Sequence, residues 1–284
     1  MSAPSLPTLL WHGWEPAWSV DAAAALAVAL YVLAVVRARS PWPARRGLAF
    51  AGGVACVVIA LQSGIGAFDD RLLSIHMVQH LLLLEVAPLM LLAGRPGLLA
   101  LRAAPRDARP WMVRRLEALR PLTHPVWCLA LFGAVVAATH LPGFYDATLR
   151  HPVLHDSEHV LYLLAGLLMW WPLVDADPLA RRRLSGMGRL VYLIAAMVPM
   201  TILGAYLDRH TSLVYAGYAA PARALGVSAV VDQQQAGAIM WVIGSTLMIV
   251  AGLWQAMAAM VEEERRLVVR ERRAALGVEQ GPER

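Results

Sequence analysis

Charged residues are scarce in this sequence. Of its 284 residues only 16% are Asp, Glu, Lys or Arg, whereas 58% are hydrophobic. An ordinary soluble domain carries about 25% charged residues. The composition therefore excludes a soluble enzyme and a disordered chain, and it is typical of a protein with several membrane-spanning helices.

Cysteine is rare and lysine is missing altogether. The two cysteines, Cys56 and Cys128, lie inside apolar runs and form no CxxC motif, so the sequence offers neither a disulfide scaffold nor a thiolate metal site. All 25 basic residues are arginine. These arginines lie between the apolar runs, where basic residues set the orientation of membrane helices, and we therefore expect no nucleic-acid partner.

Seven apolar stretches approach the roughly 20 residues that a helix needs to cross about 30 Å of hydrocarbon. They lie at about residues 20–37, 47–67, 74–94, 125–141, 156–174, 189–207 and 233–258. The sequence therefore predicts an all-α fold, a polytopic transmembrane bundle of seven helices. Residues 20–260 would form this domain, between an external N-terminal segment (1–19) and a charged cytoplasmic tail (261–284).

Arginine is distributed unevenly over the connecting segments. Residues 37–46, 95–120, 175–189 and the tail after Glu262 carry four, seven, four and six arginines, and each alternate loop carries at most two. Basic loops stay in the cytoplasm, so we expect the N-terminus outside and the C-terminus inside. Residues 1–19 contain no basic residue, and we expect them to be retained because a signal peptide needs one.

The histidines gather on one side of this expected membrane. Eight of the nine fall at or near the outer face, and only His124 falls at the inner one. The third span opens on His76-x-x-x-His80 and the fifth on His155-x-x-x-His159. Residues i and i+4 lie about 40° apart on one helix face, so each pair can converge on one ion. For a single pair, hydrogen-bonded interfacial histidines are the alternative.

Three further polar side chains lie at the outer ends of the expected spans, at the same membrane depth as the two histidine pairs. His140 ends the fourth span, Glu158 shares the face of the histidine pair on the fifth, and Asp232 opens the seventh. Asp232 has two interpretations, a metal ligand or an ordinary N-cap that supports the site. We expect a metal site at the outer interface, formed by His76, His80, His140, His155, Glu158, His159 and Asp232.

Copper is the metal that these residue types favour. Imidazole suits copper, zinc, iron or nickel, and copper binds most tightly among the divalent ions. Thioether ligands would favour Cu(I), and three methionines, Met77, Met200 and Met240, are candidates. A methionine in a membrane helix, however, usually only packs in the core. Glu85 lies near mid-membrane, opposite His76 around the helix, so it cannot join this site. Such an intramembrane carboxylate is either functional or a hydrogen-bonded structural group.

An ordered set of motifs resembles the CtaG family of membrane proteins, the assembly factors of caa-type cytochrome c oxidases. The motifs are His76-Met-Val-Gln-His80, Ala87-Pro88, Gly94-Arg95-Pro96, His140-Leu-Pro-Gly-Phe-Tyr-Asp146, His155-x-x-Glu-His159, Trp170-Trp171-Pro172 and Asp232-Gln-Gln. The resemblance implies an assembly factor in a bacterial plasma (inner) membrane rather than an enzyme, with a part in supplying copper. It implies oxidase subunits as partners, with a soluble external copper chaperone as a further candidate. The seven residues of the expected site match the polar positions of the family, and Glu85 does not.

Two other functions remain open at this stage. Histidines from facing helices can ligate haem b in an electron-carrying cytochrome, although that geometry needs only one histidine from each helix. A di-metal membrane oxidoreductase also uses H-x-x-x-H motifs, but its histidine boxes commonly include adjacent histidines and face the cytoplasm. The leading hypothesis is a copper-binding metallochaperone, with zinc or haem b as the alternatives to copper.

Overall fold

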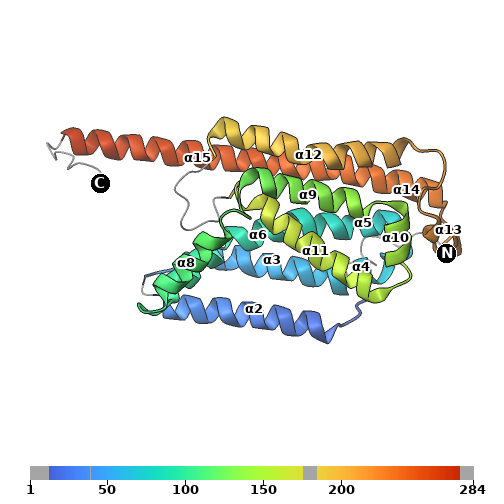
Figure 1. The fold of residues 1–284 in the computed structure, drawn as a ribbon, viewed down its shortest axis with the longest axis horizontal. Coiled ribbons are helices and arrows are strands. Elements are labelled where there is room, and N and C mark those ends of the chain that lie inside the picture. The colour runs from blue at the N-terminus through green and yellow to red at the C-terminus, as the bar shows by residue number, and fades with distance from the viewer. Residues whose placement is uncertain (1–12, 39, 175–183, 276–284) are drawn as a thin grey trace.

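The computed structural model describes residues 13–38, 40–174 and 184–275. Within these ranges it contains helices and turns but no strand, which confirms the all-α prediction. Most of the expected external segment 1–19, the arginines at 181–183 and the end of the expected tail from 276 lie outside the described residues. In Figure 1 the long helices lie side by side along one direction, with α4, α10 and α13 at one end of the bundle and α8 near the other.

A helix, or a run of consecutive helices, covers each expected span. The bounds are α2 Trp18–Arg37, α3 Ala44–Gln62, α5 Leu73–Leu81 with η1 Leu82–Val86 and α6 Ala87–Ala93, α9 Pro125–Thr139, α11 Pro152–Trp170, α12 Gly186–Arg209, and α14 Ala229–Ala238 with η3 Ile239–Ile243 and α15 Gly244–Ala275. The shorter elements are α4 Gly64–Phe68, α7 Pro96–Ala103, α8 Arg109–Leu119, α10 Pro142–Thr148, η2 Ala216–Tyr218 and α13 Ala219–Ala224.

Five of these helices or helix runs are long and apolar enough to cross a membrane, and six are if α9 and α10 count as one bent span. Helix α11 is not among them. Its first two turns carry His155, Asp156, Glu158 and His159, and these polar residues lower its hydropathy. The protein therefore has several helices able to span a membrane, while seven spans and the orientation of the termini stay predictions.

The chain bends sharply where the fourth expected span ends. Helices α9 and α10 meet at 75° across a short break, and His140 is the C-cap residue directly after α9, with Pro142 beginning α10. A proline has no backbone N–H to continue a helix and fixes its own φ, so it favours a new helix start. The bend leaves His140 at the end of the bundle where α10 lies.

Two of the long helices contain a π-helical turn. η1 interrupts the third span and carries Glu85, and η3 interrupts the last and carries Met240. The two turns face each other, because a Cβ added at Gly244, directly after η3, would lie 3.0 Å from Glu85 Oε1. Single π turns inside α-helices occur frequently at functional sites.

A glycine allows close contact between helix α11 and the helix run that begins with α5. Gly166 on α11 is buried against η1 and α6, and a Cβ there would collide with the carbonyl oxygen of Leu84 and lie 2.7 Å from Pro88 Cγ. Small residues of this kind let membrane helices approach each other through their backbones. The contact holds α11 against the helix run that begins with α5.

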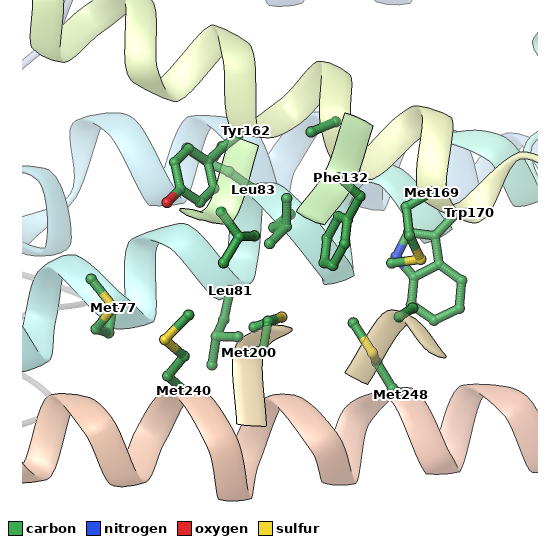
Figure 2. Packing of buried hydrophobic residues seen from close by; sticks show 14 of the residues in the cluster. Met77, Leu81, Leu83, Phe132, Tyr162, Met169, Trp170, Met200, Met240 and Met248 are labelled. Atoms are coloured by element: carbon green, nitrogen blue, oxygen red, sulfur yellow. The ribbon is translucent and has the colours of Figure 1, made fainter. Parts of the chain in front are cut away.

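The core between these helices is apolar and rich in methionine. Figure 2 shows Met77, Leu81, Met200 and Met240 at one end of the buried cluster, and Met169, Trp170 and Met248 at the other. All seven side chains are at most 6% exposed. Outside this core, many of the apolar side chains on α2 and α12 are exposed, as expected of helices that face lipid.

The orientation of the protein can be tested with two introduced cysteines. Ser185 is exposed at the start of α12, and Ser212 is exposed just beyond its end. The two residues therefore mark opposite ends of that helix. In a chain with Cys56→Ala and Cys128→Ala, we expect Ser212→Cys to react with an impermeant thiol reagent in intact cells and Ser185→Cys to be protected. The reverse labelling pattern would place the histidines in the cytoplasm.

Candidate metal centre

Four imidazoles from two helices meet at the end of the bundle. Helix α5 begins at Leu73 and helix α11 at Pro152, so both histidine pairs fall in the first two turns of their helices. The ring centroids of His76 and His80 are 4.0 Å apart and those of His155 and His159 are 4.5 Å apart. Between the helices, His76 lies 5.4 Å from His155 and 6.3 Å from His159. The two H-x-x-x-H motifs thus form one cluster.

Two carboxylates complete the cluster. Glu158 Oε2 lies 4.0 Å from His76 Nε2, and Asp69 Oδ2 lies 3.9 Å from His155 Nε2 and 4.0 Å from His159 Nε2. The ligating atoms of His76, His80 and Glu158 all fall within 4.8 Å of one another, and so do those of Asp69, His76 and His155. His76 belongs to both groups, so the two groups are adjacent.

Asp69 is the ligating side chain that the sequence analysis missed. It lies in the turn between α4 and α5 and is only 5% exposed. Burial raises the pKa of this carboxyl to about 7, and a hydrogen bond with Gln79 opposes the rise. A cation close to Asp69 would favour its ionised form. The available signal was an acidic residue just before the helix that carries His76, but acidic residues in such loops are usually solvated.

Many polar atoms of this cluster have no hydrogen-bond partner among the residues that the structure describes. Both ring nitrogens of His76 and His80, Nε2 of His155 and His159, and both carboxylate oxygens of Glu158 are buried without a hydrogen bond. Leaving one such group unsatisfied costs about 1–3 kcal/mol, and native proteins contain few of them. One nitrogen from each imidazole, together with the carboxylate oxygens, is a donor set that could hold a metal ion.

His140 approaches the cluster from the break after α9. Its ring centroid lies 6.2 Å from that of His80, and its Nδ1 lies 2.9 Å from the carbonyl oxygen of Val136. An Nδ1–H that donates to this carbonyl leaves the lone pair on Nε2, the arrangement typical of metal-binding histidines. His140 Nε2 has no partner, so it is available as a ligand.

Asp232 belongs to α14, and its side chain contacts the start of α5. Its Oδ2 accepts a hydrogen bond of 2.6 Å from the backbone N–H of Leu73, and its Oδ1 accepts from the N–H and the hydroxyl of Ser74. The N-cap residue of α5, Leu72, has no side-chain acceptor, so Asp232 caps that helix from α14. The structure therefore gives Asp232 the supporting position and does not bring it into either group of ligating atoms.

Buried tyrosines enclose the cluster. They are Tyr145, Tyr162, Tyr215 and Tyr218. The ring of Tyr162 stacks on His80 with centroids 3.9 Å apart, and the hydroxyl of Tyr218 donates a 2.7 Å hydrogen bond to the carbonyl oxygen of Asp69. Tyr162 follows Glu158 by four residues on α11 and so shares its face, whereas the other three belong to the segments between long helices. The hydrogen bond from Tyr218 holds the backbone at Asp69 in place.

Comparison with known proteins gives a family and several distant relatives. A family model described as cytochrome c oxidase caa3 assembly factor (Caa3_CtaG) matches residues 29–261, a range that includes the whole cluster. Uncharacterized proteins of Mycobacterium bovis and Mycobacterium tuberculosis are each 29% identical over 254 residues, and one of Mycobacterium leprae is 28% identical over 259. These matches cover 85–86% of this chain and 38–39% of the relatives, so the chain spans about two fifths of their length. No solved structure matches.

Proposed function

Because the chain belongs to the family of cytochrome c oxidase caa3 assembly factors, we propose that it holds a copper ion at the outer interface and delivers it to the oxidase. The ion would lie in the cluster of His76, His80, His155, Glu158 and His159, with Asp69 as an added ligand and His140 nearby. The partners are then oxidase subunits, and a soluble external copper chaperone is a candidate donor. The location is the plasma membrane of a bacterium.

The observation that supports copper is the set of unpartnered imidazoles and carboxylates. Neutral imidazoles bind Cu(II) more tightly than the other divalent first-row ions. Glu158 and Asp69 supply up to two negative charges, which balance a divalent cation in a buried site where an uncompensated charge is costly. Zinc fits the same donors with lower affinity and is the alternative cargo.

The arrangement of the ligands suits transfer. The His155 side chain is 17% exposed, whereas those of His76 and Glu158 are fully buried. Since His76 belongs to both groups of ligating atoms, an ion can pass from the group of Asp69 and His155 to the group of His80 and Glu158 by exchanging one ligand at a time. The cluster offers more ligating side chains than one ion binds at a time. The ion can therefore also leave the site by exchanging one ligand at a time.

Haem b fits the same residues less well. A haem has to lie as a flat plate between two axial imidazoles. Here the rings of His76 and His80 are in edge contact at 4.0 Å, and Tyr162 stacks on His80 at 3.9 Å. A porphyrin plane between any facing pair would have to displace the neighbouring rings. A visible spectrum of the purified protein without a haem band is the expected result.

Copper content tests the proposed site directly. In His76→Leu/His159→Leu we expect stoichiometric copper binding to be lost, while the unfolding free energy of the metal-free protein stays equal or rises. The rise is expected because leucine replaces buried polar groups that have no partners. Metal analysis of purified protein and thermal unfolding measure the two effects.

The matched control replaces two histidines that lie away from the cluster. His151 is exposed and His210 is half-buried, and neither belongs to a group of ligating atoms. His151→Leu/His210→Leu should therefore keep its copper. Unchanged copper in the His76/His159 variant, or an equal loss in the control, would contradict the proposed site.

A further inference from the structure

A small cavity lies beside the histidine cluster, further into the bundle. Its volume is about 10 Å³, close to the space that one water molecule occupies inside a protein. The side chains of its lining that carry a sulfur, nitrogen or oxygen atom are those of Met77, His80, His140, Tyr162, Met200 and Met240, and the rest of the lining is leucine and valine. The cavity is therefore large enough for one ion.

The three methionines reach this cavity from three separate helix runs. Met77 comes from α5, Met200 from α12, and Met240 from the π turn η3. They are 1%, 3% and 3% exposed. Figure 2 shows them following one another along the same part of the core, whereas Met169 and Met248 lie beside Trp170 at the far end of the view. A thioether sulfur is a soft, polarisable donor that suits Cu(I).

Two imidazoles also line this cavity, and they carry nitrogen atoms that have no partner. Neither ring nitrogen of His80 has a hydrogen-bond partner, and Nε2 of His140 has none either. The Nδ1 atom of His140 is held by the carbonyl oxygen of Val136 at 2.9 Å, so the ring is fixed with its free nitrogen available. Buried polar atoms without a partner mark a place where a ligand is missing from the hydrogen-bond network.

The charge of the lining selects a monovalent ion. Thioethers, neutral imidazoles and a tyrosine hydroxyl carry no charge, and no carboxylate lines the cavity. The cost of burying an ion rises with the square of its charge, so a monovalent ion costs about one quarter as much as a divalent one.

We propose that this cavity is a second metal site, specific for a soft monovalent ion, with Met77, Met200 and Met240 as sulfur donors and His80 and His140 as nitrogen donors. The assignment of Cu(I) as its ion in the cell rests on the proposed function. His80 belongs to both sites, with His76 4.0 Å to one side and His140 6.2 Å to the other. The carboxylate-containing cluster suits Cu(II), and the neutral cavity suits Cu(I).

Silver(I) is the probe for this site, because it is soft, monovalent and inert to oxidation under the conditions used. The experiment uses the full chain purified in detergent with Cys56→Ala and Cys128→Ala, since thiols bind silver. We expect about one tightly bound Ag(I) whose X-ray absorption spectrum shows sulfur neighbours. Met200→Leu/Met240→Leu, which nearly conserves side-chain volume, should weaken silver binding by roughly 10-fold or more and remove sulfur from the spectrum.

The matched control is Met169→Leu/Met248→Leu, which removes two buried methionines from the other end of the same core. It should bind silver as the parent protein does. If Met200→Leu/Met240→Leu does not fold, Met77→Leu alone should still lower the number of sulfur neighbours. Silver without sulfur neighbours, silver binding unchanged in the Met200/Met240 variant, or an equal loss in the control overturns the second site.

The second site and the proposed function can fail separately. His76→Leu/His159→Leu should lose Cu(II) and keep Ag(I) with its sulfur neighbours, which supports two sites. Silver bound through sulfur in a protein that binds no Cu(II) would support the second site and contradict the proposed function. Cu(II) bound in a protein whose silver has no sulfur neighbours would overturn the second site alone.

Discussion

Bacteria whose chain carries His76→Leu and His80→Leu are expected to make the oxidase polypeptides and keep their haem absorbance, yet to lose oxidase activity by roughly 10-fold or more. The physical reason is that His76 belongs to both groups of ligating atoms and His80 to one of them, so no group keeps its donors. The oxidase would then receive haem but an incomplete copper centre. Difference spectra of membranes, oxygen consumption and the copper content of purified oxidase measure these effects.

Copper supply and timing separate an assembly role from electron transfer. Excess copper in the medium should partly restore activity, because a weakened site fills again by mass action. His151→Leu/His210→Leu serves as the control and should assemble active oxidase. Depletion of the protein after the oxidase is complete should leave respiration unchanged. An immediate stop of electron flow through fully metallated oxidase would contradict the assembly role.

Gly166→Ala is expected to destabilise the bundle by about 3 kcal/mol, the upper part of the usual range for overpacking a core. The added methyl group would collide with the carbonyl oxygen of Leu84 and lie 2.7 Å from Pro88 Cγ. A backbone carbonyl cannot relieve the collision by changing a rotamer, as a flexible side chain could. Helix α11 would have to move away from η1 and α6. Because α11 carries three of the cluster's ligating side chains, copper affinity should fall together with stability.

The control for this prediction is Gly133→Ala on α9. A Cβ at Gly133 meets nothing within 4 Å, and alanine favours a helix over glycine by up to about 1 kcal/mol. This variant should therefore unfold at the same denaturant concentration as the parent or a higher one, and it should bind copper normally. Equal behaviour of the two alanine variants would show that the contact at Gly166 is not closely packed.

The features that were predictable from the sequence are those that depend on neighbours within one helix. Hydropathy placed each expected span where the structure has a helix or a run of helices. The spacing of His76 and His80, and of His155 and His159, placed each pair on one face, and the structure brings the pairs together. Glu158 follows from the same spacing. His140 was placed correctly because the proline after it ends the helix.

The features that were missed depend on contacts between distant segments. Asp69 resembles any acidic residue in a loop until the turn before α5 is packed against α11 and covered by Tyr218. Asp232 was expected either to bind metal or to cap its own helix, and in the structure it caps α5 instead. The π turns at Glu85 and Met240 shift the helix by one residue, and no residue type in the sequence marks such a shift.

The cap that Asp232 places on α5 has a consequence for the order of events during synthesis. Asp232 lies 159 residues after its partner Leu73 in the chain. At about 5–20 residues per second, the ribosome adds Asp232 roughly eight to thirty seconds after the helix of His76 and His80 has been made. Until then the first turn of that helix lacks its acceptor and is free to fray. A nascent chain therefore holds the histidine pair loosely, and the site becomes rigid only when the last long helix is in place.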